Sequence, residues 1–166
     1  PSLALDIAHA PPAVRHFPAR ALVPRDGRAG NGQAAKICNN TILGVSMIAV
    51  SEAFVLAEKL GLEAQKLFDI ASKSSGQCWS MTSYCPVPGV GPETPADRDY
   101  QGGFAAALML KDLRLAEAAA QKAGAVTPLC AAAALAKARL STPPTTAVLD
   151  FSITTVLLDH RTALKT

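Results

Sequence analysis

A lysine and an asparagine at helical spacing are the first candidates for chemistry in this sequence. Lys36 and Asn40 lie in the segment GNGQAAKICNN, residues 30–40. Because they are four residues apart, a helix places them on one face. Partial burial near a helix N-terminus disfavours a charged ammonium, and a neutral amine can exchange a proton with a substrate hydroxyl while the amide holds a substrate oxygen. A solvated lysine and a locally bonded asparagine are the alternative, and spacing alone leaves both open.

Two further places carry side chains that could contact a ligand. Lys111 and Asp112 follow each other on an amphipathic segment, where the lysine could reach an anionic cofactor or the pair could simply face solvent. Trp79 lies in SSGQCWS, residues 74–80, and could wall a pocket or belong to the core. The pattern alone does not require a functional role at either place.

The cysteines and histidines have no spacing typical of a metal site, so no metal is predicted. No two cysteines form a CxxC pair, and the three histidines are scattered along the chain. A chain of this size can fold without disulfides, so we expect reduced and mostly buried thiols. The cysteines are Cys38, Cys78, Cys85 and Cys130.

A long helix is expected to position the first candidate pair. Its apolar residues extend over 33–60, between a Gly-Asn-Gly turn and Gly61, and they lie nearly all round the helix. A helix of this kind is usually buried within a bundle. Further helices are predicted over 63–72, 104–122, 127–140 and 148–164, with a long loop over 74–103. No strand pair is convincing, so the predicted fold class is all-α, a bundle around one long buried helix.

Length and composition exclude several classes of protein. The 166 residues are 49% hydrophobic and 17% charged, which suits a folded domain rather than a disordered chain. The net charge is +3, and four arginines against two aspartates place +2 of it in residues 1–29. The basic stripe of a nucleic-acid-binding protein is therefore not predicted. Residues 41–57 are short for a membrane span and contain Glu52, so no membrane segment is expected.

The first 29 residues differ in composition from the rest. They contain five of the twelve prolines and show no sustained periodicity, which excludes a long helix there. We expect an irregular leader rich in proline and arginine over 1–29, and one all-α domain over 30–166.

Several motifs in a fixed order give the sequence a resemblance to a known family. The segments are residues 30–40, SSGQCWS at 74–80, YCPVPGV at 84–90, YQGGF at 100–104 and LMLKDLRLA at 108–116. Together they resemble the β-hydroxyacid dehydrogenases, and most closely the branch that acts on 3-hydroxyisobutyrate. The resemblance is strong over about 30–140 and weak beyond it.

The resemblance implies a fold, a reaction and site residues. It implies the helical C-terminal domain of an enzyme that oxidises 3-hydroxyisobutyrate to methylmalonate semialdehyde in valine catabolism, with NAD as cofactor and NADP not excluded. Lys36 would be the catalytic acid/base, and Asn40 would assist catalysis and bind the substrate. Lys111 and Phe104 would bind the cofactor, and Trp79 would border the substrate pocket.

The resemblance also implies partners and leaves alternatives. The family has an N-terminal Rossmann domain with a glycine-rich dinucleotide loop, and the sequence shows neither. We therefore expect a C-terminal half that acts on a small 3-hydroxy acid as a homo-oligomer, without nucleic acid or membrane. The cytoplasm, or the mitochondrial matrix of a eukaryote, would suit it. The alternatives are a non-catalytic helical dimerisation module and a related semialdehyde reductase.

Overall fold

The described part of the chain is built from helices joined by loops. The computed structural model describes residues 31–140 and residue 152. The helices are α2 (Asn31–Lys59), α3 (Ala64–Ala71), α4 (Trp79–Thr82), the 3₁₀ helix η3 (Pro95–Arg98), α5 (Ala106–Ala123) and α6 (Pro128–Leu140). The all-α prediction is confirmed over these residues. The expected leader at 1–29 and the expected helix at 148–164 lie outside them, apart from residue 152.

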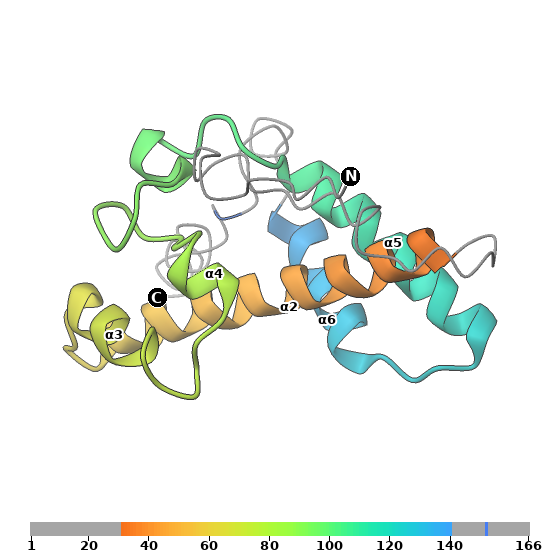
Figure 1. Ribbon diagram of the computed structural model, residues 1–166, viewed down its shortest axis with the longest axis horizontal. Coiled ribbons are helices and arrows are strands. Elements are labelled where there is room, and N and C mark those ends of the chain that lie inside the picture. Colours follow the sequence, from red (N-terminus) through yellow and green to blue (C-terminus); the bar gives the residue numbers. More distant parts are fainter. Residues whose placement is uncertain (1–30, 141–151, 153–166) are drawn as a thin grey trace, which may run out of the picture.

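Helix α2 is the spine of the molecule. At 1.5 Å per residue its 29 residues extend over about 43 Å. Figure 1 shows α5 and α6 beside the half of α2 that comes first in the chain, and α3 and α4 beside its later half. The other helices are thus distributed along α2 rather than gathered at one end.

Two hydrophobic clusters follow from this arrangement. The first joins Met47 of α2 to α5 and α6, and its buried members include Met109, Leu113, Cys130, Ala133 and Ala134. The second joins Val50 and Phe54 of α2 to α4 and the loop that follows it, through Met81, Cys85 and Val90. Because both clusters use the same helix, α2 connects the two halves of the core.

The buried stripe of α2 begins with small, polar and sulfur-containing residues and continues with the apolar Val50, Phe54 and Ala57. Asn40, Gly44, Met47 and Ser51 are buried at intervals of four, three and four residues. Ile42 lies off this stripe and is 70% exposed. Apolar residues lie nearly all round α2, but one side of it is exposed, because residue types alone do not reveal which face the neighbouring helices cover.

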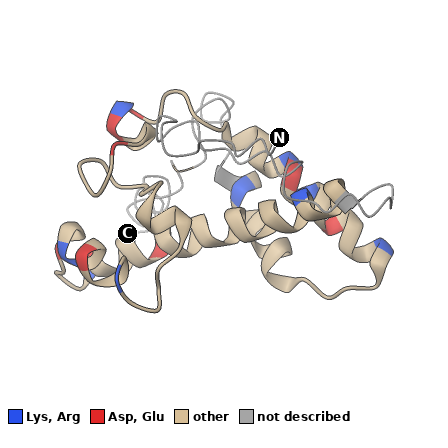
Figure 2. Cartoon of the chain, viewed as in Figure 1, with Lys and Arg blue, Asp and Glu red and all other residues tan. Residues whose placement is uncertain are grey.

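Helix α2 also passes a simple test for a membrane span. The segment Gly32–Lys59 is long and apolar enough to cross a membrane, by length and composition only. Figure 2 shows that its middle carries no charged residue. Its packing against α4, α5 and α6 is that of a core helix, which meets the same criteria.

The ends of the later helices agree with the sequence signals. Helix α5 ends at Gly124, which has the left-handed conformation with φ of 67°. Helix α6 begins at Pro128, where the missing N–H costs no helical hydrogen bond. In α3, Leu67 packs against the second cluster, whereas Ile70 is 60% exposed.

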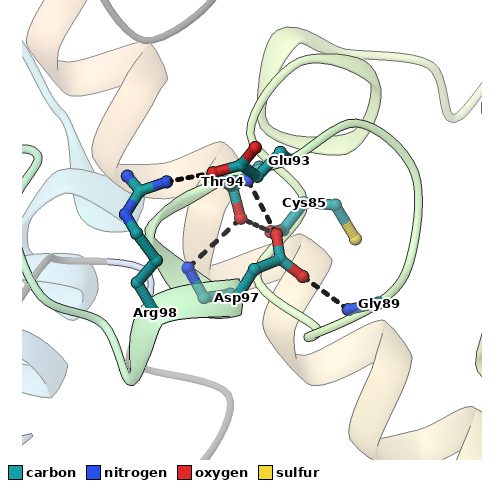
Figure 3. Close-up of polar contacts among 7 residues, drawn as sticks. Cys85, Gly89, Glu93, Thr94, Asp97 and Arg98 are labelled. Carbon is teal, nitrogen blue, oxygen red and sulfur yellow. Dashed lines mark hydrogen bonds and ion pairs between the residues drawn. The ribbon is translucent and has the colours of Figure 1, made fainter.

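The segment 74–103, predicted as an unstructured loop, contains α4 and η3 and is held by internal hydrogen bonds (Figure 3). The Asp97 carboxylate accepts from the backbone N–H of Gly89 at 2.7 Å and of Thr94 at 2.8 Å. The Thr94 hydroxyl donates to the carbonyl of Cys85 at 3.0 Å and accepts from the N–H of Ala96. Asp97 and Thr94 therefore connect the segment around η3 to Gly89 and to Cys85. The hydrogen bonds from Gly89 and Thr94 lower the pKa of the Asp97 carboxyl.

All four cysteines are free thiols, as expected. Cys85 and Cys130 are buried, Cys78 is intermediate, and Cys38 is exposed. The prediction of mostly buried thiols is therefore right for two of them and wrong for Cys38, which lies on the outer side of α2. Burial raises the pKa of the Cys85 thiol to about 11.

Candidate functional site

A buried hydrogen bond between α2 and α5 lies at the centre of the candidate site. The Asn40 amide nitrogen Nδ2 donates to Asp112 Oδ2 at 2.8 Å. Asn40 is 8% exposed and Asp112 is 9% exposed. Since a carboxylate can only accept, the orientation of the amide is set by its partner. The bond fixes the Asn40 side chain and ties the early part of α2 to α5.

The position of Asp112 follows from the periodicity of α5. The buried residues of this helix are Ala106, Met109, Asp112, Leu113 and Ala116, which form one stripe. A carboxylate within such a stripe is costly unless a hydrogen bond compensates it. The interpretation of Lys111 and Asp112 as a pair that simply faces solvent is therefore wrong for Asp112. The spacing of Asp112 from Met109 and Ala116 was the signal that could have revealed its burial.

Lys111 occupies the exposed side of the same turn. Its ammonium Nζ lies 3.7 Å from Asp112 Oδ1, and its side chain is 63% exposed. The Asp112 carboxylate thus meets Asn40 through one oxygen and Lys111 through the other. Because most of the lysine side chain remains in solvent, its charge is accessible to an anionic group.

Lys36 lies one helical turn before Asn40, on the same helix. Four residues correspond to about 6 Å along the helix axis, so Lys36 and Asn40 are neighbours on one face of α2. Lys36 is exposed, and the partial burial expected for it is not provided by the described residues. The predicted sharing of one helix by Lys36 and Asn40 is confirmed, and their proposed roles remain predictions.

Phe104 and Trp79 both lie beside the first hydrophobic cluster, since the buried Tyr84 on which Trp79 stacks belongs to it. Phe104 is partly buried and packs against the first cluster, as does Ile37, the residue after Lys36. Trp79 stacks on Tyr84 with ring centroids 4.8 Å apart and is partly exposed. It therefore combines a packed face with an open one, and its place at a substrate pocket stays a prediction.

Helix α4 attaches Trp79 to a point of α2 that lies after Asn40. Ser80, the residue after Trp79, shares a hydrogen bond of 2.9 Å with Ser46 of α2. Ser46 lies six residues after Asn40, about 9 Å farther along the helix axis. The structure thus brings Asn40, Lys111 and Asp112 together, and it anchors Trp79 farther along α2.

The available donors suit an organic anion better than a metal ion. Among the described residues, no group of three or more histidine, cysteine, aspartate or glutamate side chains could hold a metal. The exposed Lys111 ammonium beside the buried Asn40–Asp112 pair offers a positive charge to a phosphate or carboxylate. A single exposed ammonium suits an anionic group of any kind, and contact of Lys111 with a cofactor stays a prediction.

A family model for the NAD-binding region of NADP-dependent 3-hydroxyisobutyrate dehydrogenase matches residues 30–147. Among curated relatives, a probable 3-hydroxyisobutyrate dehydrogenase of Mycobacterium tuberculosis is 52% identical over 126 residues, which cover 76% of this chain and 42% of that protein. The mitochondrial 3-hydroxyisobutyrate dehydrogenase of Drosophila melanogaster is 52% identical over 103 residues, covering 62% of this chain and 32% of the relative.

A third relative and a solved structure extend the comparison. The NAD-dependent L-serine dehydrogenase of Pseudomonas aeruginosa is 47% identical over 133 residues, covering 80% of this chain and 44% of that protein. The structure of Mycobacterium tuberculosis 3-hydroxyisobutyrate dehydrogenase with L-serine has a TM-score of 0.74 and 51% identity, covering 78% of this chain and 44% of that one. The chain therefore spans less than half the length of the relatives it matches.

Proposed function

The chain belongs to the 3-hydroxyisobutyrate dehydrogenase family, and from this premise we propose that it forms the helical C-terminal part of an NAD-dependent dehydrogenase. The proposed reaction is the oxidation of 3-hydroxyisobutyrate to methylmalonate semialdehyde, with residues 30–166 as the helical domain and an N-terminal cofactor-binding domain in the full-length enzyme. The observation that carries the proposal is the buried hydrogen bond between Asn40 and Asp112. Exposed Lys36 lies one helical turn before Asn40, and exposed Lys111 is next to Asp112. The chain is 52% identical over 126 residues to a probable dehydrogenase of this name.

Proton transfer and substrate anchoring fall to two residues of α2. NAD, when bound, accepts the hydride that leaves the substrate carbon. Lys36, in its neutral form, takes the proton of the substrate hydroxyl and returns it in the reverse direction. Asp112 accepts one hydrogen of the Asn40 amide, and the other amide hydrogen would hold a substrate oxygen. Asn40 then meets the substrate with its orientation already fixed.

The remaining candidates contact the cofactor or border the substrate. The Lys111 ammonium is exposed and suits the anionic part of NAD, and it would serve NADP as well. Phe104 lies two residues before α5 and packs against the first cluster, and we propose that it lies beside the cofactor. Trp79 would border the substrate with its open face, at the part of α2 that carries Ser46.

L-Serine is a second candidate substrate, favoured by two of the comparisons. One relative is named as an L-serine dehydrogenase, and the solved structure is described with L-serine. Serine and 3-hydroxyisobutyrate are both derivatives of 3-hydroxypropanoate. Serine carries an amino group on the second carbon, where 3-hydroxyisobutyrate carries a methyl group. The same proton acceptor and amide could therefore serve both.

A substrate panel on the full-length enzyme tests the proposal. We would measure NADH or NADPH formation with 3-hydroxyisobutyrate and L-serine, and NADH or NADPH consumption with tartronate semialdehyde, succinic semialdehyde and glyoxylate. The expected result is a kcat/KM with NAD that is highest for 3-hydroxyisobutyrate. Preference for serine would assign the second candidate, and preference for another semialdehyde would assign a related reductase. No turnover of any member would favour a non-catalytic helical module.

Assembly and location are parts of the same proposal. Ile42, Leu56 and Leu60 expose apolar side chains on and just after α2, and pairing of two copies would cover such surfaces. We propose a homo-oligomer, which light scattering of the full-length enzyme would detect. The Drosophila relative is named as mitochondrial, so the mitochondrial matrix is the proposed compartment in a eukaryote and the cytoplasm in a bacterium.

A further inference from the structure

We infer that Gly44 is a positioning residue of the site: its missing side chain allows α2 and α5 to approach closely enough for the Asn40–Asp112 hydrogen bond. Gly44 lies one helical turn after Asn40 on the buried stripe of α2. The hydrogen bond is an observation of the structure, and only its effect on turnover rests on the proposed function.

The space at Gly44 is already filled by α5. A Cβ atom there would lie 2.9 Å from Cδ2 and 3.2 Å from Cδ1 of Leu113, and 3.2 Å from Sδ of Met109. Leu113 follows Asp112 directly, and Met109 lies one turn before Asp112. The Gly44 contact and the Asn40–Asp112 bond are therefore successive contacts of one helix–helix interface.

The neighbouring side chains have little room to move away from an added methyl group. Leu113 and Met109 are completely buried in the first cluster together with Met47. The Cys130 thiol of α6, a helix that packs against both α2 and α5, donates to the backbone carbonyl of Leu113 at 3.7 Å. Because cores are packed as densely as crystals, a methyl at position 44 should separate the helices or displace the α5 turn. Either movement lengthens the 2.8 Å bond from Asn40.

Gly32 does not share this environment. Gly32 lies on the same helix, and a Cβ atom there would meet nothing within 4 Å. Alanine is a better helix former than glycine, so neither replacement should weaken α2 by itself. Gly32→Ala is therefore the control for a glycine-to-alanine change in α2. A loss of kcat found only in Gly44→Ala would come from the interface with α5.

Leu113→Val supplies a compensating change. It removes both Cδ atoms that a Cβ at position 44 would approach, while a β-branched apolar residue remains in the core. If the small size of Gly44 matters at this interface, the double variant Gly44→Ala/Leu113→Val should recover most of the kcat that Gly44→Ala loses. A general loss of stability would instead be larger in the double variant than in either single one.

The experiment compares these variants in the full-length enzyme by kinetics and crystallography. We expect Gly44→Ala to lower kcat by about tenfold to a hundredfold, with the KM for NAD within about twofold, because a small displacement of an anchoring group slows the chemical step. The double variant should regain most of the kcat. In the Asp112→Asn background, where the bond is already altered, Gly44→Ala should cost about twofold or less in kcat.

The outcomes separate this inference from the proposed function. Unchanged kcat in Gly44→Ala, or an equal loss in the wild-type and Asp112→Asn backgrounds, would overturn the positioning role. If the wild-type enzyme turns over no 3-hydroxy acid, the proposed function fails, and crystal structures decide the inference. An Asn40 Nδ2 to Asp112 Oδ2 distance beyond hydrogen-bonding range in Gly44→Ala, restored in the double variant, would support it. An unchanged distance would overturn it.

Discussion

At the scale of residues, the chemistry depends on how the Asp112 carboxylate is compensated. Asp112 lies in the buried stripe of α5, and the Asn40 amide donates to it at 2.8 Å. Lys111 approaches the other carboxylate oxygen from the solvent side at 3.7 Å. The buried contact holds the proposed substrate anchor, while the exposed lysine remains accessible to a ligand.

Removal of the Asp112 carboxylate should destabilise the fold. In Asp112→Ala the buried Asn40 amide loses its acceptor, so we expect the free energy of unfolding to fall by about 1–3 kcal/mol. Urea denaturation of the full-length enzyme would measure it. Arg114→Ala, an exposed change two residues later, is the control and should lie within about 0.5 kcal/mol of wild type. Equal stability of the two variants would contradict the buried role of Asp112.

Lys111→Ala should act on cofactor binding rather than on folding. Its ion pair with Asp112 is largely exposed, and such pairs contribute little stability. Loss of a charged contact to the cofactor should raise the dissociation constant of NAD by about tenfold or more, measured by calorimetry. Lys122→Ala, an exposed lysine in the last turn of α5, is the matched control. A dissociation constant equal to that of the control would remove Lys111 from the cofactor site.

At the scale of elements, the segment 74–103 owes its order to Asp97. Two backbone N–H groups, from Gly89 and Thr94, donate to its carboxylate, and the Thr94 hydroxyl continues the connection to Cys85. The Tyr100 hydroxyl adds a bond to the carbonyl of Pro86 at 3.0 Å. The loop thus presents α4 and Trp79 to α2 as a folded unit.

The stability of this segment should depend on pH through Asp97. The two N–H donors lower the pKa of its carboxyl in the folded state. Its contribution to stability is therefore complete above the unfolded-state pKa and is lost as the pH falls through the lower, folded-state pKa. Asp97→Asn should flatten the acid-side decline in melting temperature, and Glu93→Gln, an exposed change in the same loop, should flatten it less. An identical decline in Asp97→Asn and wild type would refute this assignment.

Sequence patterns predict the helices better than they predict faces or polar contacts. Gly124 and Pro128 act through local backbone geometry, so they located the ends of α5 and α6. The buried face of α2 was not predictable in the same way, because Gly44 and Asn40 are buried by what α5 brings against them. The order in segment 74–103 was missed for a similar reason, since Asp97 bonds to the N–H of Gly89, eight residues away.

The candidate site was predictable only where one helix carries it. Lys36 and Asn40 share a face of α2, and their spacing alone gives that relation. The bond between Asn40 and Asp112 joins positions 72 residues apart, and no local pattern specifies such a pairing. The resemblance to a family supplied the roles of the residues but not this contact.

At the scale of the whole molecule, α2 contributes residues to both hydrophobic clusters, and a buried cysteine in each cluster can test whether that cluster excludes solvent. Cys130 belongs to the first cluster and Cys85 to the second, whereas Cys38 is exposed on α2. Burial raises the pKa of the Cys85 and Cys130 thiols, to about 11 for Cys85, so few thiolates form near neutral pH.

Alkylation should therefore label Cys38 first. In the native full-length enzyme we expect iodoacetamide to modify Cys38 readily and to spare Cys85 and Cys130 until the protein unfolds. Peptide mass spectrometry along a time course measures the order. The control is the same reaction in denaturant, where all three should react at similar rates. Early labelling of Cys85 in the native enzyme would show that the second cluster does not exclude the reagent.

We propose that proton transfer and substrate anchoring belong to this helical part, and that most of the cofactor binding belongs to another domain of the enzyme. The most direct measurement is the turnover of 3-hydroxyisobutyrate by full-length Lys36→Ala, with the dissociation constant of NAD determined on the same sample. We predict that kcat falls by about a hundredfold or more while the NAD dissociation constant stays within about threefold of wild type. Turnover equal to wild type in Lys36→Ala would contradict the account.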